Sequence, residues 1–439
     1  MTKPRTLPQN TIAEQSVLGA ILIDKDAINI VSELLKPECF YNETHLVIYE
    51  CMLLLYEQRK PIDILTISAE LKKKKVKAAD SDFFTALIES VPTSANVEHY
   101  ASIVREAYTK RSLIQASGEI SELAYSDGKD VKEVLDKAES VVFSISQRFI
   151  TRGFTPIKDT LASSFDKIDE IHRLGSGLRG IKTGFSVLDN MLSGMQKSNL
   201  LILAARPGTG KTAIMLNIAQ YISVHEKVPI GIFSLEMSKE ELVDRLLVAQ
   251  ADVDAWRLKT GKLTEDDFTK ISEAMGQLAD APLYIDDTPG LSIMEMRSKA
   301  RRLQLENKIG LIIVDYLQLV NPDRHYESRV QEVSMVSQAL KNLARELNVP
   351  VLAASQLSRA VEHRGEKRPQ LADLRESGAI EQDADVVTFL YRPDTDTTGP
   401  TIPTKLLVAK HRNGPTGEID LLFRGDRIKF CSVEKSHTE

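Results

Sequence analysis

A strand, a glycine-containing loop and a helix start follow one another at residues 200–212, and this succession constrains the fold most. The apolar run Leu200–Ala204 is typical of a buried strand, and the loop ends in Gly210, Lys211 and Thr212. This ending matches the phosphate-binding loop, in which N–H groups at a helix N-terminus hold phosphates. The lysine then reaches the β- and γ-phosphates, and the hydroxyl binds Mg²⁺. Because Ala205 replaces the first glycine of the pattern, an ordinary glycine-rich loop is the alternative.

Alternating strands and helices surround this loop. The strands are expected at the apolar runs Leu200–Ala204, Pro229–Phe233, Leu311–Val314, Val349–Ala353, Val386–Leu390 and Leu406–Ala409. Residues 211–223, 238–250 and 328–347 are expected to be helical. The alternation predicts an α/β domain with a mainly parallel sheet. Ligands bind beyond the carboxyl ends of such strands, so the residues that follow each run are candidates for chemistry.

Three polar residues end predicted strands. Asp315 follows the run 309–314, where an aspartate that assists Mg²⁺ belongs, although a turn residue is the commoner role of a lone strand-end aspartate. Tyr316 comes next, so the group that activates water must come from elsewhere. We expect it to be Glu236, with helix capping as the alternative. The amide of Gln356 is positioned to sense the γ-phosphate.

Two cations precede a turn near the C-terminus. Lys410 and Arg412 are two residues apart in a predicted strand that runs into Asn413 and Gly414, a strong hairpin signal. The two side chains therefore point to one face. They are expected to stabilise charge on a transferring phosphoryl group, in cis or across an interface. The alternative is a pair of solvated cations that protects an edge strand.

The remaining chain divides into a helical part and a connecting segment. The length of 439 residues predicts two or three domains. Apolar residues recur at helical spacing through residues 1–150, which predicts a small all-helical domain. Residues 151–180 hold a single amphipathic segment, which is too short to be stable alone and packs either on its own chain or on a neighbouring subunit. Residues 181–439 form the α/β domain.

Charge and composition restrict the function less than the motifs do. The net charge is −6, and residues 1–150 carry 18 basic and 22 acidic side chains, so charge neither indicates nor excludes nucleic acid. The sequence contains no apolar run of membrane-spanning length and no secretory signal, so a membrane role is not expected. Three scattered cysteines are typical of a reducing cytoplasm. A zinc site of Cys39, His45 and Cys51 is not expected, because their spacing lacks a paired ligand element.

Several sequence segments together resemble one family. The segments are 8–10, 14–20, 90–96, the phosphate loop, Phe233–Met237, Asp315–Leu319, Ser355–Arg359, Asp373–Asp385 and Lys410–Gly417. They resemble the DnaB-type replicative DNA helicases, chromosomal or phage-encoded, over nearly the whole chain. The resemblance implies a homohexameric ring with a RecA-like ATPase domain and a helical N-terminal collar, and the region 355–385 is its most specific part.

The resemblance also assigns roles to residues. ATP and Mg²⁺ would lie between subunits, with Gly208, Gly210, Lys211, Thr212 and Asp315 around the phosphates and Mg²⁺. Glu236 would activate water, Gln356 would contact the γ-phosphate, and Arg245 would lie beside the base. Lys410 and Arg412 are similar to the finger residues that act on a neighbour's ATP. Residues 155–174 match a linker helix that docks on the adjacent ATPase domain.

The same resemblance implies a DNA channel. Single-stranded DNA would pass through the ring 5′→3′, held by Arg375, Glu376 and Gly378 without reading sequence. The loop 321–329, with Arg324 and Arg329, is a weaker channel candidate. A primase and a helicase loader are the implied partners. The stretch 394–403 receives no role.

Two other functions share parts of this pattern. A RecA-like strand-exchange ATPase has the same sheet and phosphate loop but forms filaments on DNA. An ATP-gated scaffold or loader binds DNA and helicase without separating strands. Filaments in micrographs would favour the first, and ATP turnover without strand displacement would favour the second.

Overall fold

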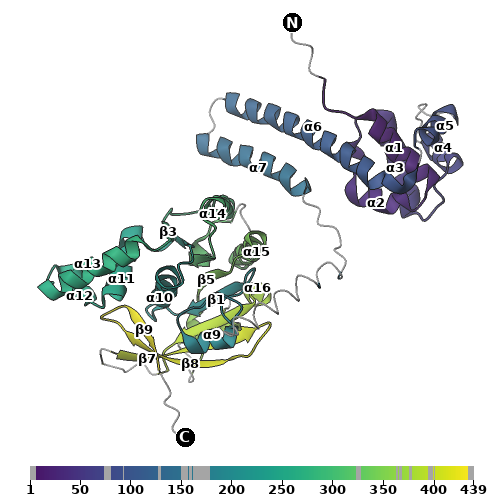
Figure 1. Ribbon diagram of the computed structural model, residues 1–439. Coiled ribbons are helices and arrows are strands. Elements are labelled where there is room, and N and C mark those ends of the chain that lie inside the picture. Colours follow the sequence, from purple (N-terminus) through teal and green to yellow (C-terminus); the bar gives the residue numbers. More distant parts are fainter. Residues whose placement is uncertain are drawn as a thin grey trace. The chain divides into compact units, whose positions relative to one another are not determined.

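The computed structural model describes residues 6–73, 81–91, 93–126, 130–149, 157, 161, 178–322, 328–361, 364, 368–374, 378–393, 399 and 401–433. The chain divides into two compact units, Met1–Ser163 and Ser164–Glu439 (Figure 1). The predicted docking helix at 155–174 lies outside the described residues, apart from Ile157 and Leu161. Its docking therefore stays a prediction.

The described part of the first unit is helical, as predicted. Asn10 and Asn42 cap two of the helices, since their side chains accept hydrogen bonds from the N–H groups of Ala13 and Thr44 at 3.0 and 2.8 Å. The elements are α1 (Thr11–Ile23), α2 (Ala27–Leu34), η1 (Pro37–Cys39), α3 (Glu43–Glu57), α4 (Ile64–Lys73), α5 (Ser81–Glu89), η2 (Ser94–Asn96), α6 (Val97–Tyr125) and α7 (Val131–Phe149). The long helices α6 and α7 lie side by side (Figure 1).

The core of this unit contains a buried polar pair. His45 Nδ1 lies 2.8 Å from Glu14 Oε2, and the N–H of Tyr41 donates to the other carboxylate oxygen at 2.7 Å. Cys39 and Cys51 are buried in the surrounding apolar cluster. These contacts tie α1 to α3 and give His45 a structural partner.

The second unit is built on a sheet of nine described strands in the order β3-β2-β4-β5-β1-β6-β7-β8-β9. The strands from β3 to β6 are parallel, and β7, β8 and β9 extend the sheet in antiparallel fashion. Their bounds are β1 (Leu200–Ala205), β2 (Ile230–Ser234), β3 (Leu283–Asp286), β4 (Leu311–Asp315), β5 (Val351–Gln356), β6 (Val386–Tyr391), β7 (Thr401–His411), β8 (Gly417–Arg424) and β9 (Lys429–Ser432). The predicted α/β class with a mainly parallel sheet is confirmed.

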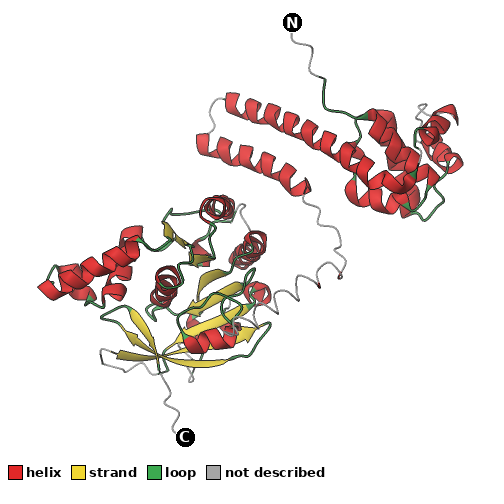
Figure 2. Ribbon diagram, viewed as in Figure 1, coloured by secondary structure: helices red, strands yellow, loops and turns green. Residues whose placement is uncertain are grey.

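Helices cover both faces of the sheet (Figure 2). Leu201 and Leu203 of β1 pack with α10, whereas Leu200 and Ile202 point to the opposite face and pack with α14 and α15. Because both faces are buried, the central strands appear in the sequence as continuous apolar runs. The helical elements are α9 (Ser186–Leu192), α10 (Lys211–Val224), α11 (Lys239–Ala251), α12 (Ala255–Thr260), α13 (Glu265–Ala279), α14 (Ile293–Asn307), η3 (Leu317–Leu319), α15 (Arg329–Leu347), η4 (Arg359–Val361), η5 (Leu371–Asp373) and α16 (Gly378–Asp383).

Candidate nucleotide-binding site

The predicted phosphate loop connects β1 to α10. Gly208 and Gly210 adopt φ angles of +77° and +108°, which L side chains rarely adopt. A Cβ at position 210 would also lie 2.9 Å from a ring carbon of Phe430. Both constraints require glycine at 210, where the chain turns into α10. The N–H groups of the first turn of α10 have no partner within the helix and lie next to the loop. They can therefore donate hydrogen bonds to a phosphate.

Lys211, Thr212 and Asp315 meet at the carboxyl ends of β1 and β4. The Thr212 hydroxyl donates to Asp315 Oδ2 at 2.6 Å, and Lys211 Nζ lies 3.6 Å from Asp315 Oδ1. Asp315 is 3 % exposed, and its Oδ1 has no hydrogen-bond partner within the described structure. A buried carboxylate oxygen without a donor beside a hydroxyl suits a hard cation that prefers oxygen ligands. The residues present therefore fit Mg²⁺.

A cavity of about 530 Å³ opens beside this cluster. Glu236, which follows β2, lines it together with Gln356 at the end of β5. Gln356 is the register partner of Ala205, so its amide lies next to the start of the phosphate loop. The cavity thus brings together the candidate base, the candidate γ-phosphate sensor and the phosphate loop, although they are far apart in the sequence. The described lining residues are Ala205, Arg206, Pro207, Gly208, Gly210, Lys211, Thr212, Ala213, Glu236, Met237, Arg245, Tyr316, Gln356, Phe423, Gly425 and Ile428.

Tyr316 lies beside the lysine of the phosphate loop. Its ring centroid lies 4.2 Å from Lys211 Nζ, within the range of a cation–π contact. Burial, together with the carboxylates of Glu236 and Asp315, raises the pKa of the Tyr316 phenol above its ordinary value. The phenol therefore stays protonated at neutral pH and is available as a hydrogen-bond donor.

Arg245 of α11 also lines the cavity, together with Phe423 of β8 and with Gly425 and Ile428 of the β8–β9 turn. Phe423 stacks on Phe430 with ring centroids 4.6 Å apart, and Phe430 N donates to Asn217 of α10 at 2.8 Å. An arginine and apolar side chains provide a surface on which a planar base can lie. Sequence reasoning did not identify Phe423, Gly425 or Ile428 as site residues.

Lys410 and Arg412 lie at the opposite end of the sheet. Asp385 precedes β6, and one of its carboxylate oxygens accepts from Leu200 N at the start of β1. Arg412 N donates to Asp385 O at 2.9 Å, whereas the phosphate loop follows the other end of β1. The six residues of β1 span about 20 Å. The two cations are therefore not in the nucleotide cavity of their own subunit.

Their side chains contact the last carbonyls of α16. Lys410 Nζ donates to Ala384 O at 2.8 Å and to Glu381 O, and Arg412 donates to Gln382 O. Burial and the adjacent Arg412 charge lower the pKa of Lys410 below its ordinary value. Both cations interact favourably with the negative end of the helix dipole. The hairpin predicted at Asn413–Gly414 is present as the β7–β8 connection.

The predicted DNA contacts are described only in part. Gly378 begins α16 and is exposed, whereas Arg375 and Glu376 lie outside the described residues. In the loop 321–329, Arg324 also lies outside them. Arg329 begins α15, and its guanidinium donates to Glu332 at 2.7 Å.

Two family models match the chain. The DnaB-like helicase C terminal domain matches residues 180–432, and the DnaB-like helicase N terminal domain matches residues 6–106. The chain belongs to the DnaB-like helicase family. The predicted family, the predicted replicative DNA helicase function and the predicted class of ATP-dependent helicase are thereby confirmed.

Full-length relatives agree with this assignment. The replicative DNA helicase DnaC of Bacillus subtilis is 44% identical over 437 residues, which are 98% of this chain and 96% of the relative. The replicative DNA helicase DnaB of Geobacillus stearothermophilus is 44% identical over 441 residues, which are 99% and 97% of the two chains.

Solved structures of similar proteins share the fold. A structure titled "The Structure Of A DnaB-Like Replicative Helicase And Its Interactions With Primase" covers 97% of this chain and 100% of its own, with a TM-score of 0.79 and 32% identity. A second solved structure, an isolated ATPase domain by its title, covers 64% of this chain and 100% of its own, with a TM-score of 0.60 and 36% identity. Among the described residues, no helix is both long and apolar enough to span a membrane.

Proposed function

We propose that this chain forms a homohexameric ring that hydrolyses ATP and moves 5′→3′ along single-stranded DNA, separating the strands at a replication fork. One observation carries the proposal. Lys211, Thr212 and Asp315 cluster at one end of the sheet, and Lys410 and Arg412 lie at the other end. A head-to-tail ring joins such unlike surfaces of neighbouring subunits and closes on itself.

In this proposal each nucleotide lies between two subunits. Lys211 and the N–H groups at the start of α10 bind the β- and γ-phosphates, and Arg245 and Phe423 lie against the base. Thr212 and Asp315 would hold Mg²⁺, which supplies charge neutralisation along the phosphates.

Hydrolysis then depends on two further groups of the same cavity and two cations of the neighbour. Glu236 accepts a proton from the attacking water, and the Gln356 amide donates a hydrogen bond to the γ-phosphate. Lys410 and Arg412 of the adjacent copy stabilise the charge that develops on the transferred phosphoryl group. Because Arg412 is 45 % exposed, its guanidinium is accessible to a neighbouring molecule.

We further propose that Arg375, Glu376 and Gly378 hold the DNA backbone in the channel, and that the helical unit binds a primase and a helicase loader. A similar solved structure is titled as a helicase with its interactions with primase, which supports the first of these partners. A role at the fork also implies a cytoplasmic location.

The test combines native mass measurement with an assay of strand separation. Native mass measurement of the full chain with ATP and single-stranded DNA is expected to give six copies. A forked duplex with a free 5′ tail is expected to be unwound, and the same duplex with only a 3′ tail is not. Filaments, or ATP turnover without strand displacement on either fork, would contradict the proposal.

A further inference from the structure

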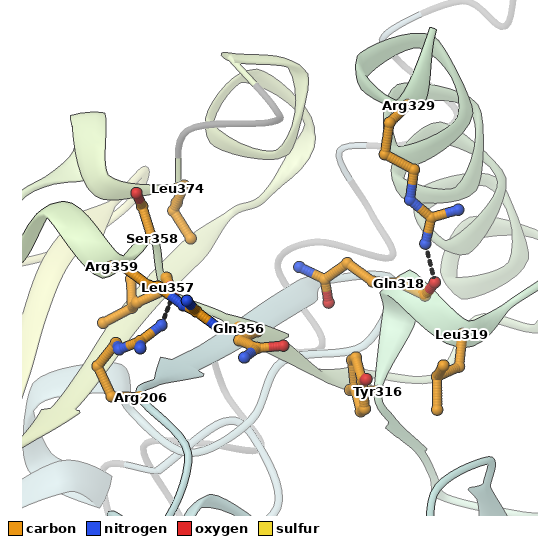
Figure 3. Close-up of a pocket in the computed structure, with 10 residues that line it drawn as sticks. All are labelled: Arg206, Tyr316, Gln318, Leu319, Arg329, Gln356, Leu357, Ser358, Arg359 and Leu374. Carbon is orange, nitrogen blue, oxygen red and sulfur yellow. Dashed lines mark hydrogen bonds between the residues drawn. The ribbon is translucent and has the colours of Figure 1, made fainter.

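A second cavity, of about 490 Å³, adjoins the nucleotide cavity (Figure 3). Arg206, Tyr316 and Gln356 line both, so the two share one wall. That wall is on the phosphate side of the nucleotide cavity, because it contains Arg206 of the phosphate loop and Gln356, the candidate γ-phosphate sensor. The described lining residues are Arg206, Tyr316, Gln318, Leu319, Arg329, Gln356, Leu357, Ser358, Arg359 and Leu374.

The lining of this second cavity is strongly basic. Three guanidinium groups, of Arg206, Arg329 and Arg359, line it, and the residues described there include no carboxylate. Figure 3 shows Arg206 and Arg329 on opposite sides, with the amides of Gln318 and Gln356 between them. Planar guanidinium groups and amide N–H donors match the oxygens of a phosphate group.

Contacts with the fold hold two of these arginines in position. Arg206 donates to Leu357 O at 2.7 Å, which links the phosphate loop to the segment after β5. Arg329 donates to Gln318 O, which links α15 to the segment after β4, and it pairs with Glu332 of its own helix at 2.7 Å. Arg359 is exposed in η4. Arg329 and Arg359 are both exposed, and with Arg206 they form an anion site that the fold holds in part.

We propose that this second cavity binds a phosphate group. The inference rests on the proposed function, which supplies two sources of that group. One is the inorganic phosphate released from ATP next to the shared wall, and the other is a backbone phosphate of single-stranded DNA. In either case the bound phosphate group lies against Tyr316, Gln356 and Arg206, which also line the nucleotide cavity.

The experiment compares Arg359→Gln with Arg345→Gln in the full chain. Arg345 is an exposed residue near the C-terminal end of α15, about 24 Å along the helix from Arg329, so it serves as a charge-matched control. In the first arm the ADP-saturated protein is titrated with inorganic phosphate, followed by ³¹P line broadening. In the second arm a labelled oligo-dT is titrated at several salt concentrations, followed by fluorescence anisotropy.

For released phosphate as the source, Arg359→Gln is expected to weaken phosphate binding about tenfold, the scale of one charge-assisted hydrogen bond. For a DNA phosphate as the source, it lowers oligo-dT affinity about tenfold and reduces the slope of log K against log[salt] by about 0.7. Arg345→Gln changes neither quantity. Arg359→Lys, which keeps the charge, is expected to restore part of the affinity.

If both arms give wild-type values for Arg359→Gln, the phosphate site is overturned. Wild-type unwinding of forks in that case leaves the helicase function intact. Conversely, Arg359-dependent phosphate binding by a wild-type protein that fails to unwind forks supports the site and contradicts the proposed function.

Discussion

The two ends of the central sheet carry two different sets of candidate site residues. At the carboxyl ends, Lys211, Thr212 and Asp315 contact one another around a cavity in their own subunit. At the amino ends, Lys410 and Arg412 contact carbonyls in and just after α16 and are not among the described residues that line this cavity. In the proposed ring, the first group binds phosphate within its own subunit, whereas the second acts on the nucleotide of a neighbouring copy.

The largest effect on ATP turnover is expected from removal of Lys211 at the carboxyl ends. Lys211→Ala deletes the positive charge at the phosphate loop and should lower kcat for ATP about 10³-fold, the upper range for one preorganised donor. Lys197→Ala removes an exposed lysine near the start of β1 and should leave kcat unchanged. Steady-state phosphate release measures both. A Lys211→Ala protein with full turnover would refute the assignment of the loop.

Glu236→Gln tests the chemistry at the carboxyl ends. Loss of the proton acceptor should lower kcat about 10²- to 10³-fold while ATP binding persists, because general bases contribute on this scale. Glu240→Gln, at an exposed position in the first turn of α11, is the matched control. Single-turnover hydrolysis and a nucleotide-binding titration separate the two effects. Equal losses in both variants would remove Glu236 from its role.

Gly210→Ala tests the geometry of the phosphate loop. Its backbone φ of +108° and the 2.9 Å approach of Phe430 both oppose a Cβ. The KM for ATP should rise about tenfold, since strain of roughly 1–3 kcal/mol per such residue distorts the loop. Gly276→Ala in α13, where no atom lies within 4 Å of the added Cβ, should leave KM unchanged. An unchanged KM in Gly210→Ala would argue against this loop geometry.

The smallest effect is expected for the stability of the protein when Arg412, at the amino ends of the strands, is replaced. Arg412→Ala removes a contact with Gln382 O and a 3.6 Å pair with Asp385, at a half-exposed site. The free energy of unfolding should fall by about 1 kcal/mol or less. Asp385→Ala deletes the buried acceptor of Leu200 N and should lower Tm more. If Arg412→Ala unfolds the protein instead, its effect on activity has a structural cause.

The central strands were predictable because each of them is marked by a continuous apolar run in the sequence. All six predicted apolar runs correspond to strands β1, β2, β4, β5, β6 and β7. Strand β3 was missed because it is an edge strand, paired within the described structure with β2, and its residues are only half-buried. An edge strand with one covered face gives no continuous apolar run.

The phosphate end of the candidate site follows from equally local signals, whereas at the nucleobase end only Arg245 was expected, from the family resemblance. Gly210, Lys211 and Thr212 are contiguous, and Asp315 directly follows a strand. Phe423 and Ile428 are more than 200 residues from the loop and reach the cavity through β8, β9 and the contact of Phe430 with α10. Nothing in their local sequence marks them, because the antiparallel extension of the sheet brings them there.

The location of Lys410 and Arg412 could be found only from the fold. Their spacing of two residues puts Lys410 and Arg412 on one face of a strand. It does not show whether they act on the nucleotide of their own subunit or on that of a neighbour. The bond between Arg412 N and Asp385 O, at the start of β6, puts them at the end remote from their own phosphate loop. The DNA contacts of Arg375, Glu376 and Gly378 all stay predictions from the family resemblance.

The most direct test of a composite site mixes two inactive proteins. Lys211→Ala and Arg412→Ala subunits are combined in equal amounts, dissociated and reassembled, and ATP turnover is measured. If Arg412 acts on the neighbour's nucleotide, an Arg412→Ala subunit beside a Lys211→Ala subunit forms one intact site, and random assembly restores roughly a quarter of the sites. We predict recovery of turnover to roughly that fraction of wild type. A mixture as inactive as its two components would contradict the composite site.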